Sequence, residues 1–142
     1  MSYSIFHNLV IKASTKEVFY AVSQPEHLNN WWTLKSSGIP KLSQEYNLNF
    51  TDTYNWFCKV SEIKTNEYIL FKMTMSDKDW NPTTFGFNLK ETEMGTSVRF
   101  SHSNWRIQND HFKIASFCWA ILLNGLKKYL EKGIIIPFEE RN

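Results

Sequence analysis

The spacing of apolar residues changes once between residues 45 and 132, from every second residue to the spacing of a helix. Alternating residues predict strands over 45–50, 54–63, 67–75, 84–93 and 96–103. One helical stripe then runs from about residue 109 to 132: Phe112, Ala115, Trp119, Leu122, Leu123, Leu126 and Leu130. Alternation of this kind is typical of antiparallel strands with one solvated face. Because strands and helices are segregated along the chain, we expect an α+β fold whose long final helix covers the sheet.

The first 44 residues predict one more strand and two short helices. Residues 3–12 alternate as a strand. Ser14 and Glu17 form a capping box, which predicts that a helix starts here. That helix must end before Pro25, which suits the first turn of a second short helix. Residues 33–44 are rich in serine, glycine and proline, so we expect a loop there.

Length and charge narrow the possible functions. A chain of 142 residues suits one domain, expected over 1–142, and its six Trp, six Tyr and eleven Phe supply a large core. The net charge of +2 with no basic stripe argues against nucleic-acid binding. The longest apolar run, 117–123, is too short to cross a bilayer, so no membrane partner is expected. The first residues do not resemble a signal peptide, which favours the cytoplasm.

The sequence contains no recognised catalytic or metal-binding motif. Its two cysteines, Cys58 and Cys118, form no CxxC pair, and the four histidines form no HxxH or HExxH motif. We therefore expect no metal, no cofactor and no catalytic residue. Both cysteines lie among apolar residues, so we expect them to be buried and unreactive.

Several segments together resemble a known superfamily. They are 11–19, 25–28, 31–32, 60–63, 95–102 and 119–130. In order and spacing they are similar to the START/SRPBCC superfamily, and within it to the branch named for activators of the heat-shock-protein-90 ATPase (AHSA-like). The resemblance implies a helix-grip fold, in which about six or seven antiparallel strands curl around the C-terminal helix and leave a cavity between them. Relatives include carriers of hydrophobic ligands, polyketide cyclases and co-chaperone domains.

The expected cavity would be lined mainly by aromatic side chains. Strand alternation and the helical stripe turn one set of residues to the same side, with Trp32 at the rim: Trp56, Phe71, Met73, Phe85, Phe87, His102, Trp119 and Leu123. Such a set either fills a plain core or lines a site for a small molecule, and the sequence leaves both open. In either case we expect Trp56 and Trp119 to be mostly buried.

His102 has two interpretations on this inward face. It could be a polar anchor or general acid/base at the cavity wall, or a core histidine hydrogen-bonded to the backbone, which we favour. The leading functional hypothesis is therefore non-catalytic binding of a small hydrophobic ligand. The alternatives are a co-chaperone-type interaction module and a cyclase-like enzyme that uses His102.

The final helix carries a second apolar face. Ile114, Phe117 and Ile121 lie opposite the core stripe at helical spacings of three and four. The tail that follows, 134–138, is also apolar, which is unusual for a chain end. Either the tail folds back over this face, or the face stays open and meets a second copy or a different partner. We favour the fold-back or a homodimer, because both need only this chain.

Overall fold

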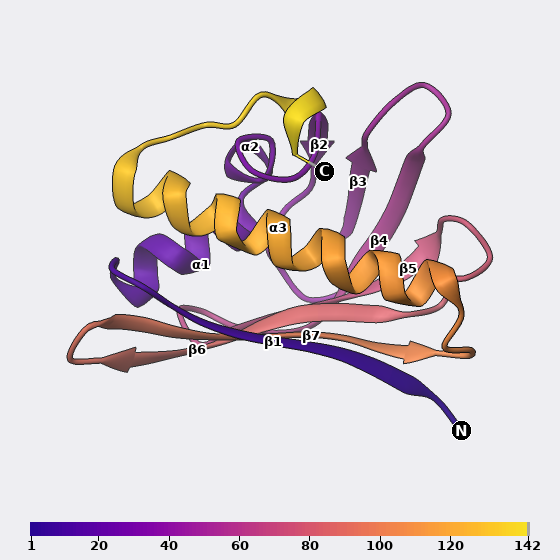
Figure 1. Ribbon diagram of the computed structural model, residues 1–142, viewed down its shortest axis with the longest axis horizontal. Helices are drawn as coiled ribbons and strands as arrows, with labels where there is room; N and C mark the ends of the chain where they lie inside the picture. Colours follow the sequence, from indigo (N-terminus) through magenta and orange to yellow (C-terminus); the bar gives the residue numbers. More distant parts are fainter. Residues whose placement is uncertain (142) are drawn as a thin grey trace.

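Seven antiparallel strands form one sheet, and a long helix lies across one of its faces (Figure 1). The computed structural model describes residues 1–141. Its elements in chain order are β1 (Tyr3–Ile11), α1 (Thr15–Ser23), α2 (Pro25–Leu28), β2 (Lys35–Ser37), β3 (Glu45–Asn49), β4 (Asn55–Lys64), β5 (Tyr68–Met75), β6 (Thr84–Thr92), β7 (Gly95–Trp105), α3 (Asp110–Lys132) and the short 3-10 turn η1 (Phe138–Glu140).

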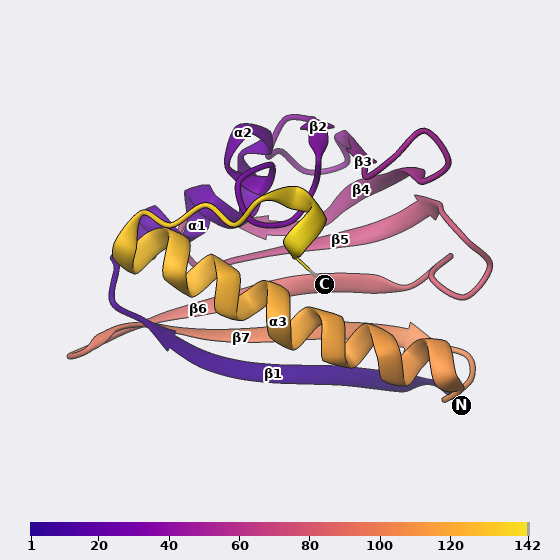
Figure 2. The ribbon, with the colours of Figure 1, turned by 45° about the horizontal axis from the view of Figure 1, so that its top comes forward.

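The strand order in the sheet is β1-β7-β6-β5-β4-β3-β2. Every neighbouring pair is antiparallel, so the predicted α+β helix-grip architecture is confirmed. The short helices α1 and α2 lie beside α3 on the same side of the sheet (Figure 2). The expected loop over 33–44 is wrong in one respect, because residues 35–37 pair with β3 as the edge strand β2. Three residues are too few to show a period in the sequence.

The predicted helix boundaries follow from local capping. Ser14 Oγ accepts a hydrogen bond of 3.1 Å from the backbone N–H of Glu17 and so begins α1. Asn109 Oδ1 accepts one of 3.0 Å from the N–H of Phe112 and begins α3. Gly133 ends α3 with a φ of 67°, a left-handed conformation that costs glycine little.

The core lies between the sheet and α3. Five residues of the helical stripe are buried, and Leu122 and Leu130 are partly buried. From the sheet, the inward residues of β5, β6 and β7 complete this layer; among them are Ile69, Phe71, Phe85, Phe87, Val98 and Phe100. The period-two pattern of the strands and the period-3.6 pattern of the helix therefore identified the sheet face and the helix face that pack against each other.

The outer edge of β1 is covered by side chains of α3. Lys127 Nζ donates a hydrogen bond of 2.9 Å to the carbonyl oxygen of Val10. Two residues on, Glu131 Oε2 accepts one of 2.8 Å from the backbone N–H of Lys12. Both backbone groups lie on the side of the strand that faces away from β7. These two polar groups, at the C-terminal end of β1, are thus satisfied by the helix and not by another strand.

The tail covers only part of the second apolar face of α3. Ile136 lies against Gly125 and, with Ile121, borders a small crevice, so Ile121 is partly buried. Ile114 and Phe117 remain open, with 59% and 68% of their surface exposed. Fold-back therefore accounts for one end of the face and leaves the other uncovered. Within residues 1–141, no helix combines the length and apolar character needed to cross a membrane.

Candidate functional site: an aromatic cavity

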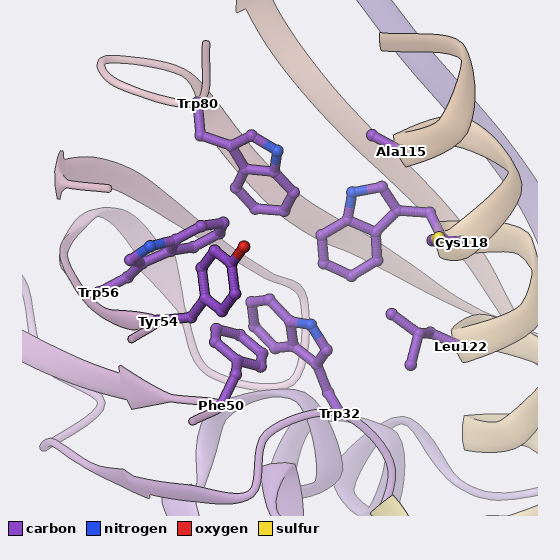
Figure 3. Close-up of a pocket in the computed structure, with 9 residues that line it drawn as sticks. Trp32, Phe50, Tyr54, Trp56, Trp80, Ala115, Cys118 and Leu122 are labelled. Carbon is purple, nitrogen blue, oxygen red and sulfur yellow. The ribbon is translucent and has the colours of Figure 1, made fainter. Parts of the chain in front are cut away.

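A cavity of about 200 Å³ lies between the sheet and the middle of α3 (Figure 3). Its lining is almost entirely apolar, and none of the lining side chains carries a formal charge. The lining consists of Trp32, Phe50, Tyr54, Trp56, Trp80, Ala115, Cys118, Trp119 and Leu122. A hollow of this character excludes charged or strongly hydrated molecules and suits a small apolar one.

Five aromatic rings form a closed circuit around this cavity. The distances between neighbouring ring centroids are 6.0 Å for Trp119–Trp80, 5.0 Å for Trp80–Trp56, 5.5 Å for Trp56–Phe50, 5.6 Å for Phe50–Trp32 and 5.0 Å for Trp32–Trp119. These separations are typical of favourable aromatic pairs. Since each ring packs on two others, the circuit holds its members in place without a ligand.

Separate parts of the chain supply the five rings. Trp32 follows α2, Phe50 follows β3, and Trp56 comes from β4. Trp80 is carried by the loop between β5 and β6. Trp119 belongs to the middle of α3. The site therefore forms only when helix, sheet and loops are packed together.

The loop that carries Trp80 is fastened to the first turn of α3. Asp77 Oδ1 accepts hydrogen bonds from the backbone N–H groups of Asp79 and Trp80, at 3.1 and 2.9 Å. Asp79 Oδ2 in turn lies 2.9 Å from His111 Nδ1 and 3.4 Å from Asn109 Nδ2. The hydrogen bond with His111 holds the pKa of Asp79 below its usual value. The cap of α3 and the cavity wall are thus joined by polar contacts.

His102 lies directly behind the cavity wall and is fully buried. Its Nδ1 accepts a hydrogen bond of 3.0 Å from the indole N–H of Trp119, which can only donate. The ring proton therefore sits on Nε2, which donates to Thr83 Oγ1 over 2.8 Å. The Thr83 hydroxyl donates to the carbonyl oxygen of Trp80. One chain of hydrogen bonds thus connects the cavity residues Trp119 and Trp80.

The burial of His102 fixes its charge. Loss of water, with a smaller contribution from the nearby His111, lowers the pKa of His102 to about 3. The ring is therefore neutral at physiological pH. The expectation of a core histidine bonded to the backbone is corrected in one respect, because both partners are side chains.

The structure divides the sequence-predicted site residues into two groups. Trp32, Trp56 and Trp119 line the cavity. The others lie outside the lining: Phe71, Met73, Phe85, Phe87, His102 and Leu123, all of them buried. Phe85 is in the layer immediately behind, 5.2 Å from the ring of Trp32 and 5.8 Å from that of Trp119. Inward strand alternation identifies the core, but only residues next to a packing gap reach the cavity.

Six lining residues were not singled out from the sequence. They are Phe50, Tyr54, Trp80, Ala115, Cys118 and Leu122. Phe50 and Leu122 could have been found, because both lie on inward faces of predicted elements. Trp80 lies in a loop whose sequence shows no periodic pattern. Only its size and aromatic character could have indicated that it lines the cavity.

One expectation about burial is confirmed and one needs correction. Trp56 is mostly buried and packs against the core, and its remaining exposed surface lies beside the exposed Tyr54. Cys118 is also partly exposed, because it lies on the flank of α3 at the cavity and not on its core stripe. Cys58 is buried as expected, and burial raises the pKa of its thiol, with Glu45 adding to the effect. In the described part of the chain, no three His, Cys, Asp or Glu side chains come together in an arrangement that could hold a metal ion.

Sequence comparison supplies a family match. The family model described as Activator of Hsp90 ATPase homolog 1-like protein matches residues 12–131. The match spans the chain from the end of β1 almost to the end of α3. No curated protein sequence matches this chain.

Several solved structures share the fold. The solution structure of the Aha1 dimer from Colwellia psychrerythraea is 30% identical, with a TM-score of 0.84 over 92% of this chain and 98% of that one. The protein SSP2350 from Staphylococcus saprophyticus is 21% identical, with a TM-score of 0.80 over 94% and 96% of the two chains. MLL2253 from Mesorhizobium loti is 19% identical, with a TM-score of 0.82 over 93% and 99%. The last two similarities concern the fold alone.

Proposed function

Because this chain belongs to the family of Activator of Hsp90 ATPase homolog 1-like proteins, we propose that it uses the family's fold to bind a small hydrophobic ligand in the aromatic cavity, without catalysis. The observation that carries this proposal is the closed circuit of five aromatic rings around an uncharged hollow. A ligand that enters exchanges water for aromatic surface and gains about 25 cal/mol for each Å² of apolar area buried.

The position of His102 favours binding over catalysis. A general acid or base must come within hydrogen-bond reach of the reacting group. Both ring nitrogens of His102 are already engaged, by Trp119 and Thr83, and the side chain has no exposed surface. A cyclase-like reaction through this residue would require the cavity wall to open.

The binding proposal is tested by titrating the protein with 4-phenylbutan-1-ol, a neutral aromatic alcohol. Excitation at about 295 nm selects Trp, so binding beside four lining Trp residues should change the emission. Ala115→Phe adds a ring inside the cavity and should abolish the response. Ala120→Phe is the matched control, because Ala120 is exposed on the same helix outside this cavity. An identical response in both variants, with both folded, would place binding elsewhere.

We also propose a homodimer as the second candidate function for the open apolar face of α3. Ile114 and Phe117 are exposed neighbours on this helix. Contiguous exposed apolar surface often marks an interaction site. The Colwellia psychrerythraea relative is described as a dimer, which favours a second copy over a co-chaperone partner as the occupant.

Phe117→Lys tests the dimer. The substitution should shift the sedimentation coefficient from dimer to monomer and leave the response to 4-phenylbutan-1-ol unchanged. Lys90→Ala, on the exposed outer face of β6 and away from α3, serves as the control and should leave the dimer intact. A wild-type protein that sediments as a monomer at high concentration contradicts the homodimer and leaves the co-chaperone-type module as the alternative for this face.

A further inference from the structure

A second hollow lies next to the aromatic cavity, beside the C-terminal tail. The two share four lining residues, namely Trp32, Phe50, Cys118 and Leu122. The second hollow measures about 220 Å³ and is completed by Phe138, Glu139 and Arg141. Figure 2 shows the tail returning alongside α3, with η1 near the middle of the helix. A ligand in the aromatic cavity therefore has a path toward the tail, where charged groups first appear.

Arg141 is the notable residue of this second hollow. Only 8% of its surface is exposed. Its Nε donates a hydrogen bond of 2.8 Å to the carbonyl oxygen of Ile136, and one terminal nitrogen donates one of 3.1 Å to that of Thr33. A guanidinium group has five N–H donors, and the hydrogen bonds of Arg141 to residues 1–141 use two of them. Both acceptors are neutral.

This buried cation has no counterion among residues 1–141. The ion pairs of the described chain involve Lys64, His111 and Lys127, and no carboxylate of residues 1–141 lies within 4.0 Å of Arg141. Burial lowers the pKa of Arg141, yet a guanidinium stays protonated at physiological pH. A buried charge without an opposite charge is costly, and an anion that reaches it recovers part of that cost.

Glu139 is the one acidic residue in the same hollow. Its side chain is exposed, and its charge raises the pKa of Arg141 without forming an ion pair. Glu139 therefore stabilises the cation from the solvent side and repels any anion that approaches. Removing its charge should strengthen anion binding at Arg141, which gives the two residues opposite expected effects.

From this arrangement we infer that the ligand is an amphiphilic organic acid, whose apolar body occupies the aromatic cavity and whose carboxylate lies against Arg141. This inference rests on the proposed function, since it assigns the ligand class of the same cavity. A guanidinium presents parallel N–H donors that match the two oxygens of a carboxylate. The uncharged aromatic circuit and Arg141, which forms no ion pair within residues 1–141, thus match the two ends of one molecule.

The test compares 4-phenylbutyrate with 4-phenylbutan-1-ol, which has the same ring and chain but no charge. At pH 7 the wild-type protein should bind the acid about tenfold more tightly than the alcohol, because one hydrogen bond to a charged group contributes about this difference in affinity. Arg141→Gln should remove this preference and leave the affinity for the alcohol unchanged. Glu139→Gln, in the 3-10 turn that precedes Arg141, should increase the affinity for the acid and leave the affinity for the alcohol unchanged. Arg141→Lys keeps the charge and should retain part of the preference.

The outcomes separate this inference from the proposed function. Equal affinity of the wild-type protein for acid and alcohol would overturn the assigned ligand class while the cavity still binds. A loss of both affinities in Arg141→Gln would show that Arg141 only fastens the tail to Thr33, and would also overturn it. Failure of the wild-type protein to bind either probe would contradict the proposed function itself.

Discussion

The indole N–H of Trp119 donates a hydrogen bond to Nδ1 of His102 in a site with no access to solvent. The contact joins α3 to β7 and fixes both the ring orientation of a cavity residue and the tautomer of the histidine. Nε2 of His102 donates a hydrogen bond to Thr83, and the Thr83 hydroxyl donates one to the carbonyl oxygen of Trp80. The same contacts therefore stabilise the loop that carries Trp80. The aromatic circuit therefore has a polar support on its inner side.

His102 should make the stability of the protein fall in acid. Its pKa is about 3 in the folded protein and 6.5 without burial, so between these values the unfolded chain binds a proton that the folded chain does not. The free energy of unfolding should decrease by up to about 1.4 kcal/mol per pH unit over this range as the pH falls. His102→Gln removes the titrating group. The free energy of unfolding of this variant, measured by urea denaturation at each pH from 7 to 4, should therefore fall less steeply with pH than that of the wild-type protein. An NMR titration of His102 with a midpoint near 6.5 would contradict its neutral state.

Trp119→Ala should destabilise the fold strongly. Trp119 is 1% exposed, contacts rings of the sheet and loses its bond to His102 when truncated. The expected cost is about 3–5 kcal/mol in urea denaturation, typical for a large aromatic side chain removed from a core. Trp56→Ala is the comparison variant. Because Trp56 is partly exposed, this substitution should lower the free energy of unfolding clearly less than Trp119→Ala does. Equal costs would mean that the two rings are equally buried in solution.

The two cysteines should differ in reactivity. Cys118 is partly exposed at the cavity, whereas Cys58 is buried with a raised pKa. Iodoacetamide should therefore modify Cys118 in the native protein and Cys58 only after unfolding, as mass spectrometry of the peptides can show. Saturating 4-phenylbutan-1-ol should slow the modification of Cys118. Cys118→Ser should remove the native-state reaction, and continued labelling of that variant would mean that Cys58 is accessible.

Asp79→Asn should loosen the loop that carries Trp80. The hydrogen bond with His111 lowers the pKa of Asp79, so its stabilising effect is present above the carboxyl's ordinary pKa of 3.8 and is lost as the pH falls through the lower, folded value. Amide hydrogen exchange at 77–80 should therefore be faster in the variant at pH 7. Asp52→Asn, an exposed carboxylate on the β3–β4 loop, is the control and should leave this exchange unchanged.

The sequence predicted the sheet and α3 well because both obey a simple period over many residues. Phe85 and Trp119 were correctly turned inward by alternation and by helical spacing. The cavity was harder to predict, because a packing gap depends on side chains from distant segments. Trp80 illustrates the limit, since hydrogen bonds through Asp77 and Asp79 place it, and neither bond leaves a periodic pattern. The burial of Arg141 likewise emerges only when the tail is seen packed against Thr33.

The side chains of Lys127 and Glu131 on the border of β1 also limit how copies of this protein can associate. An open strand edge is a template onto which another chain can add a strand, and uncontrolled addition leads to fibrils. Here Val10 and Lys12 have their outward backbone groups occupied by α3. The opposite border is β2, only three residues long. Addition of a strand is therefore hindered at the C-terminal end of β1 and by the shortness of β2, which favours the helical surface as the route to a closed, finite assembly.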